Sequence, residues 1–203
     1  MANRREFIQA CIAASAAPST TALAWNPAIE RTTRPNYFCA IFDERFPESV
    51  AFGEEVVRLG ESARSIKGDI TQLWFSEIDV QWRKEPMAIA GLTSFGPLFC
   101  LERWGWDADL RVVFRAEHSV VQNRLQHKVS GPPDVLAEAQ ARLSGPNWAT
   151  QIARLAFSCR HEICPPTEIA FPGHDRAIGT TEDEALFSWV IAPVNRANQR
   201  RRA

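Results

Sequence analysis

Short apolar runs alternate with amphipathic segments between residues 36 and 118. Apolar runs that end at polar or turn residues are typical of buried strands, and the chain has such runs at residues 37–42, 62–66, 86–92 and 110–116. The first three runs are followed by segments with apolar residues at helical spacing, at residues 47–59, 71–82 and 95–106. Strands that alternate with helices of about 12 residues indicate βαβ units. We therefore predict an α/β fold with an open, mainly parallel sheet and flanking helices, flavodoxin-like or similar in its three layers.

The second half of the chain has a different pattern. Residues 134–143 and 147–158 predict two helices, so we expect a C-terminal helical insertion. Residues 185–192 form an apolar run that predicts a further strand of the same sheet, placed at an edge or antiparallel to its neighbour. The polar segment 165–184 indicates either a functional loop or an error in this assignment of elements.

The first residues have the features of an export signal. Arg4 and Arg5 are followed by Phe7, by a mild apolar run at residues 10–17 and by a small-residue ending at Ala24. This arrangement resembles the twin-arginine signal of bacteria, although Asn3 stands where that signal usually has Ser or Thr. The resemblance implies cleavage after Ala24, contact with the twin-arginine export machinery, and a periplasmic or secreted protein that is exported after it has folded.

These patterns divide the chain into four parts. We expect a signal peptide at residues 1–24, a linker at 25–35, a single α/β domain at 36–195 and a basic tail at 196–203. The formal net charge is only −1, so no basic surplus points to nucleic acid as a partner. The chain also lacks an apolar stretch of about 18 residues, so we expect no transmembrane helix in the mature chain.

The cysteines give no firm chemistry. Cys39 and Cys100 fall in a predicted strand and helix, where they are expected to be small core residues. Cys159 and Cys164 flank His161, which leaves open a local disulfide, unbridged thiols or part of a zinc or copper site. The spacing matches no established metal motif, so we predict no metal ligands and leave any cofactor unknown.

Candidate site residues follow from the predicted sheet. In open α/β sheets, ligands bind beyond the carboxyl ends of the strands. Of the titratable residues in these positions, we expect Asp43, Asp69 and His118 to be catalytic if the protein is an enzyme. The remaining candidates are expected to bind ligand: Arg45, Thr71, Thr93, Ser94 and Glu117.

Each candidate also has a structural explanation. Asp69 and Thr71 can form only a turn and a helix cap, and Thr93 and Ser94 can likewise be caps. Asp43 can simply pair with its neighbour, and His118 can be a structural histidine. His174, in the irregular segment, is more simply explained as part of a solvated loop.

Two functional hypotheses remain. In the first, the protein is an exported binding or accessory protein that holds a small, anionic ligand or escorts a partner enzyme. This hypothesis rests on the absence of glycine-rich phosphate-binding motifs and of a Gly-x-Ser-x-Gly elbow. In the second, it is a small exported hydrolase or lyase that uses rim carboxylates and a histidine as acid and base.

Overall fold

The computed structural model describes residues 36–122, 124–158, 167–175 and 184–193. The expected signal peptide, linker and basic tail lie outside the described residues, and so do Cys159, His161 and Cys164.

The described chain folds into alternating strands and helices, followed by a hairpin, two helices and two further strands. In chain order these are β1 (Tyr37–Asp43), α3 (Pro47–Arg58), β2 (Ala63–Ile66), α4 (Thr71–Leu73), the π-helical turn η1 (Trp74–Ile78), α5 (Asp79–Lys84), β3 (Ala88–Thr93), α6 (Phe95–Asp107), β4 (Leu110–Val121), β5 (Arg124–Gly131), α7 (Pro133–Leu143), α8 (Trp148–Ser158), β6 (Thr167–Asp175) and β7 (Leu186–Pro193). The strands and helices predicted from hydrophobic spacing before residue 118 are therefore confirmed, and so is the helical insertion.

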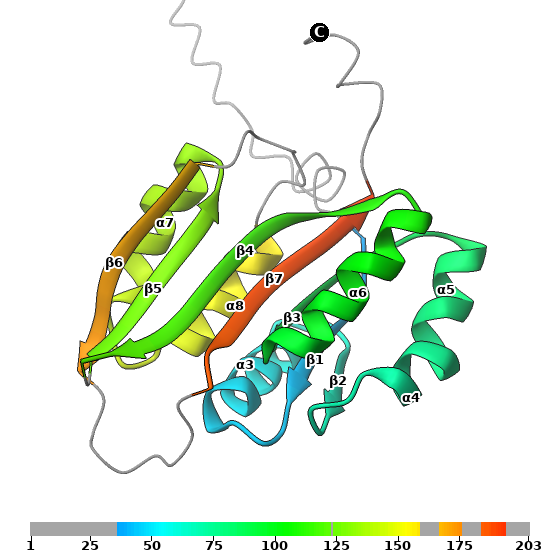
Figure 1. Ribbon diagram of the computed structural model, residues 1–203, viewed down its shortest axis with the longest axis horizontal. Helices are drawn as coiled ribbons and strands as arrows, with labels where there is room; N and C mark the ends of the chain where they lie inside the picture. Colours follow the sequence, from blue (N-terminus) through cyan, green and yellow to red (C-terminus); the bar gives the residue numbers. More distant parts are fainter. Residues whose placement is uncertain (1–35, 123, 159–166, 176–183, 194–203) are drawn as a thin grey trace, which may run out of the picture. The chain divides into compact units, whose positions relative to one another are not determined.

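The strands form one sheet in the order β2-β1-β3-β7-β4-β5-β6 (Figure 1). Only the β1–β2 and β1–β3 pairs are parallel among the described strands. The β3–β7, β4–β7, β4–β5 and β5–β6 pairs are antiparallel. The sheet is therefore mixed, and the expected mainly parallel, flavodoxin-like arrangement is not confirmed.

Two features explain this difference. The last strand, β7, enters between β3 and β4 instead of joining an edge, and it runs opposite to both. In addition, β4 continues beyond the predicted residues and turns directly into β5 through a hairpin that the helix-strand alternation did not predict. A continuous apolar run shows that a strand is buried on both faces, which favours a parallel sheet, but it does not fix the direction of each neighbouring strand.

Two hydrophobic clusters cover the two faces of the sheet. One cluster joins Phe114, Ala116 and Val190 to residues of α3, α7 and α8. The other joins Ile41, Trp189 and Ile191 to residues of α5 and α6. Figure 1 shows α7 and α8 behind β4, β5 and β6, while α6 lies in front of the centre of the sheet. Successive residues of a strand point to opposite faces and so join different clusters, except where a bulge, as between Val112 and Phe114, shifts the alternation.

The helical segment 71–84 packs its aromatic face onto the second cluster. Ile78 and Trp82 are buried, as their spacing predicted. The ring of Trp74 stacks on Trp104 with centroids 4.3 Å apart and meets Trp82 edge-on at 5.6 Å. The middle turn of this segment is a π-helix, a geometry that often marks functional sites because it redirects the side chains of one turn.

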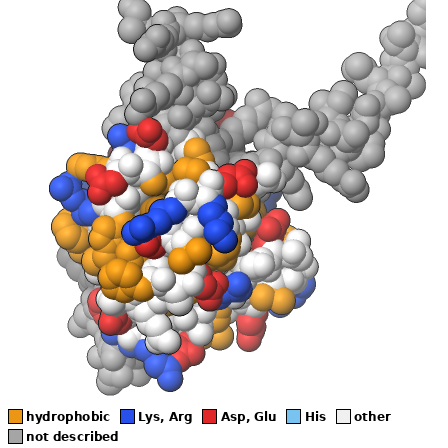
Figure 2. Space-filling view, turned by 90° about the vertical axis from the view of Figure 1, so that its right-hand side faces the viewer, with side chains coloured by type: hydrophobic (Ala, Val, Ile, Leu, Met, Phe, Trp, Pro, Cys, Tyr) orange, Lys and Arg blue, Asp and Glu red, His pale blue; other side chains and the backbone are white. Residues whose placement is uncertain are grey.

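The side of the molecule that carries α4 and α5 has a mixed surface. Figure 2 shows Lys and Arg side chains interspersed with Asp and Glu and with hydrophobic side chains. None of the helices in the described part of the chain is long and apolar enough to cross a membrane.

Candidate functional site

The carboxyl ends of β1 and β3 bring three of the predicted residues together. Asp43, at the last position of β1, is fully buried and accepts hydrogen bonds from Arg45 Nε at 3.0 and 3.2 Å and from Arg45 Nη2 at 2.7 Å. The same Nη2 lies 3.3 Å from Ser94 Oγ. Gly68, with φ of +80°, passes so close that a Cβ there would lie 2.6 Å from Arg45 Cζ. The guanidinium is therefore held in place on several sides.

Thr93 has a structural role beside this cluster. Its hydroxyl accepts the Trp189 indole N–H at 3.1 Å and donates to the Ser94 carbonyl at 2.9 Å, and both side chains are buried. Ser94 occupies the N-cap position of α6, yet its side chain makes no capping hydrogen bond. Neither side chain therefore makes the expected capping hydrogen bond. Thr93 instead bonds the indole of a core tryptophan, and Ser94 contacts Arg45.

Asp69 and Thr71 form a turn that starts the next helical segment. The Asp69 carboxylate accepts the backbone N–H of Thr71 at 2.8 Å. Hydrogen bonds from Thr71, from its side chain and then its backbone, hold the pKa of Asp69 below its usual value. Ile70, and not Thr71, is the residue at the cap position. The turn explanation of Asp69 is confirmed. Thr71 is not the capping residue, because its backbone N–H donates to the side chain of Asp69.

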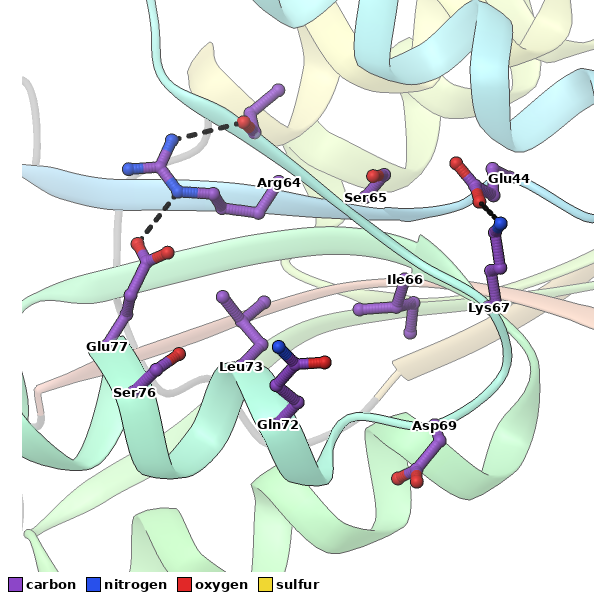
Figure 3. Close-up of a pocket in the computed structure, with 11 residues that line it drawn as sticks. Glu44, Arg64, Ser65, Ile66, Lys67, Asp69, Gln72, Leu73, Ser76 and Glu77 are labelled. Atoms are coloured by element: carbon purple, nitrogen blue, oxygen red, sulfur yellow. Dashed lines mark hydrogen bonds and ion pairs between the residues drawn. The ribbon is translucent and has the colours of Figure 1, made fainter.

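Asp69 also lies at the end of a groove between β2 and the helical segment α4–η1 (Figure 3). The groove has a volume of about 620 Å³. One wall is the whole of β2, and the other contains Gln72, Leu73, Ser76 and Glu77. Arg64 Nε bonds Glu77 Oε2 across the groove at 2.8 Å, and Lys67 Nζ lies 3.0 Å from Glu44 Oε1.

His118 lies elsewhere, in a buried polar network under α8. Its Nε2 is 2.8 Å from Ser188 Oγ, and its Nδ1 is 2.7 Å from Nδ1 of His127. These three side chains come from the adjacent strands β7, β4 and β5. All three are buried, and the Trp148 ring lies over both imidazoles with centroids 4.3 Å from His118 and 5.3 Å from His127.

Burial keeps both histidines neutral. It lowers the pKa of His127 to about 4, against a smaller opposing effect of the Leu143 carbonyl at the end of α7. Burial, and then the repulsion that a protonated His127 would exert, hold the pKa of His118 well below its ordinary value. Neutral imidazoles whose Nδ1 atoms face each other can share only one proton there, so one ring donates and the other accepts.

His127 Nε2 is buried and has no hydrogen-bond partner within the described part of the chain. The Ser188 hydroxyl donates to His118 Nε2 or accepts from it, according to which ring nitrogen of His118 carries the proton.

Asp43 and His118 do not share a site. The strand order β1-β3-β7-β4 separates them by three strand spacings, about 14 Å. Their side chains also point to opposite faces of the sheet. Asp43 lies two residues after Ile41 and so faces the second cluster, whereas His118 lies two residues after Ala116 and so faces the first cluster. The acid-base site that joined Asp43, Asp69 and His118 is therefore not assembled in this fold.

Glu117 lies on the face of β4 away from His118. It aligns with Phe187, which aligns in turn with Thr93, so two strand spacings, about 10 Å, separate Glu117 from Thr93. His174 is exposed on β6, and the segment predicted as irregular contains this strand.

Sequence reasoning missed His127 and Ser188. An alternation was present in residues 124–131, where Leu125, His127 and Val129 are buried and the intervening residues are not. That pattern predicts a strand with His127 facing the core. Ser188 carried no comparable signal, since a serine within an apolar strand does not show which polar group it meets.

Cys39 is a free, buried cysteine of β1. Burial raises the pKa of Cys39 to about 12, so its thiol stays protonated and unreactive, as expected for a core residue. No group of three or more His, Cys, Asp or Glu side chains within the described ranges is arranged to hold a metal ion.

Comparison with known proteins gives no relative: no protein-family model, curated protein or solved structure matches this chain.

Proposed function

We propose that the protein is an exported binding or accessory protein and that the groove between β2 and α4–η1 is its binding site. The observation that carries this proposal is the groove itself, an open volume of about 620 Å³ at the edge of the parallel part of the sheet. Its volume lies in the range of sites for small ligands. Asp69, which the sequence singled out, is one of its lining residues.

The lining charges favour a particular ligand chemistry. Three carboxylates (Glu44, Asp69 and Glu77) line the groove with two cationic side chains, and each cation is already paired with a glutamate. Asp69 interacts with Thr71 within the described residues. A ligand that offers hydrogen-bond donors or positive charge suits this lining better than the anion expected from the sequence.

The alternative of a hydrolase or lyase has less support. Its acid-base residues lie on opposite faces of the sheet, about 14 Å apart. The histidine is covered by Trp148 and bonded to Ser188 and His127. General acid-base catalysis requires a group within hydrogen-bond reach of its substrate, and His118 is 3% exposed.

Filling the groove tests the binding proposal. Ser76 lines the groove, whereas Val80 is an exposed side chain of α5 outside the lining. Native mass spectrometry of the full chain should show a retained ligand in the parent and in Val80→Trp, and loss of that ligand in Ser76→Trp. Equal retention by all three proteins would show that the ligand binds outside the groove. A parent chain without bound mass would contradict the expectation that the protein retains a ligand.

Export is tested separately. Replacing Arg4 and Arg5 together by lysine keeps the charge but removes the feature that resembles the twin-arginine signal. Cell fractionation should find the parent chain outside the cytoplasm and the double variant inside it. Export of both chains to the same extent would contradict the proposed route.

A further inference from the structure

Among the described residues, the outer edge of β2 pairs with no other strand, and the residues of β2 line the groove. β2 is the last strand of the described sheet on its side and pairs only with β1 there. The carbonyls of Ser62 and Ile66 accept hydrogen bonds from Ala40 and Glu44 of the β1 side, at 2.8 and 2.9 Å. Since bonding direction alternates along a strand, the N–H and C=O groups of Ala63 and Ser65 point away from β1.

All residues of this edge line the groove. The lining includes Ala63, Ser65 and Lys67 on the strand side and Leu73, Ser76 and Glu77 on the helix side. Figure 3 shows Leu73 extending from the helix toward the strand that carries Ile66. The groove thus has the residues of an edge strand along one wall and those of a helical segment along the other. Extended peptides bind such channels by adding a strand to the exposed edge.

We infer that the ligand of this groove is an extended peptide segment of a partner protein, carrying a lysine or arginine, which pairs with the outer edge of β2. This inference rests on the proposed function, because it identifies the ligand class of the same site. The four residues of β2 set the length of the added strand at about four residues, or about 13 Å.

The charges of the groove favour a basic peptide. Asp69 lies beyond the carboxyl end of β2, where its side chain is exposed. The Arg64–Glu77 pair spans the groove, and both side chains are more than one third exposed, at 39% and 36%. Ion pairs with this exposure contribute little to stability, so an incoming basic side chain can displace Arg64 from Glu77 at small cost.

A peptide pair tests the contribution of the backbone. The probe is acetyl-Thr-Lys-Thr-Lys-Thr-amide, which combines strand-forming threonines with basic side chains. Its control has the same side chains but is N-methylated at every residue, so it cannot donate backbone hydrogen bonds. On binding of the probe, the Ser65 amide proton should become protected from exchange with deuterated solvent. The affinity of the N-methylated peptide should be lower than that of the probe by a factor of about ten or more.

A variant pair tests the strand edge. Ser65→Pro removes the outward N–H at a position where an edge strand tolerates proline, and Ser65→Ala removes only the hydroxyl. Ser65→Pro should weaken binding of the probe about tenfold, while Ser65→Ala binds like the parent. Where Ser65→Pro fails to fold, judged by circular dichroism, the N-methylated peptide decides the question alone.

Other outcomes would overturn the inference. Equal binding of both peptides, or no binding of the probe, would exclude strand addition. If Ser76→Trp still loses a retained small molecule in that case, the proposed binding function stands and only the peptide assignment fails. Sedimentation that shows a dimer of the parent and a monomer of Ser65→Pro would assign the edge to a second copy of this chain instead.

Discussion

Gly173 lies directly against His127. A Cβ at Gly173 would lie 2.6 Å from His127 Nε2 and 3.1 Å from a methyl carbon of Leu125. β5 and β6 are neighbouring strands of the sheet, and the imidazole occupies the space that a larger residue at position 173 would need. The position of β6 therefore depends on a glycine facing a histidine.

Gly173→Ala should destabilise the protein by about 1–3 kcal/mol, because the added Cβ would overlap the buried His127 ring and crowd Leu125. The matched control is Gly96→Ala in α6, where a Cβ meets nothing within 4 Å. Chemical denaturation of both variants checks this expectation. A Gly173→Ala protein as stable as Gly96→Ala would show that the β5–β6 contact is loosely packed.

The buried histidines predict loss of stability in acid. The pKa of His127 is about 4 in the folded protein, below the value of about 6.5 expected in the unfolded chain. The unfolded state therefore binds the proton more readily as pH falls from about 6.5 to about 4, and the free energy of unfolding decreases across that window, by on the order of 3 kcal/mol. Above pH 6.5 this group contributes no pH dependence.

Denaturation curves measured between pH 7.5 and pH 4 provide the measurement. His127→Gln should flatten the fall between pH 6.5 and 4, whereas His174→Gln, an exposed histidine of β6, should leave it unchanged. Carboxylates also titrate in this range, so the comparison between variants carries the conclusion. The same slope in all three proteins would mean that His127 is not neutralised by burial.

Removing one charge of the Asp43–Arg45 pair should cost more stability than removing the other. The Asp43 side chain is fully buried, while the Arg45 side chain is 39% exposed. Arg45→Ala leaves a buried carboxylate without its main partner and should cost about 3 kcal/mol. Asp43→Asn should cost less, because a released guanidinium can turn into water.

A double-mutant cycle with Asp43→Asn and Arg45→Ala measures this difference. The double variant should be more stable than Arg45→Ala alone, since it removes the uncompensated charge. Arg83→Ala serves as control, because Arg83 pairs with Asp79 at 2.9 Å on the surface and should change stability by less than about 1 kcal/mol. Equal losses from Asp43→Asn and Arg45→Ala would contradict the argument.

Truncation of Trp74 and of its neighbour Phe75 should affect stability differently. Trp74 is half-buried and packs against Trp104 and Trp82, whereas Phe75 is 68% exposed. Trp74→Ala should destabilise by about 3 kcal/mol, at the low end for a large aromatic residue because part of its ring is already in water. Phe75→Ala should change stability by less than about 0.5 kcal/mol. Thermal or chemical unfolding that ranks the two variants in the opposite order would show that the segment faces the other way.

The cluster of Asp43, Arg45 and Ser94 could be predicted, whereas Asp69 is the one predicted candidate that lines the proposed groove. Asp43 and Ser94 follow two adjacent parallel strands, so the rule that places ligands beyond carboxyl ends correctly brought them together with Arg45. The same rule failed for His118. The rule predicts at which edge of the sheet a residue lies, but not which face its side chain points to. Because β4 continues past its predicted end, His118 lies within the strand and its side chain is buried in the core.

The sequence by itself determined most of the strands and helices, because hydrophobic spacing is a local property that each segment carries alone. It missed β5, and it predicted an irregular segment where β6 lies. It also determined that Ile78 and Trp82 face inward and that Asp69 forms a turn. Only the tertiary structure decided that β7 runs between β3 and β4, which strands are antiparallel, and that Ser188, His118 and His127 meet. These relationships join residues far apart in the chain: Ser188 lies 70 positions from His118, and Ile191 of β7 pairs with Ile89 of β3. They depend on strand order and direction, which long-range packing selects and no local pattern encodes.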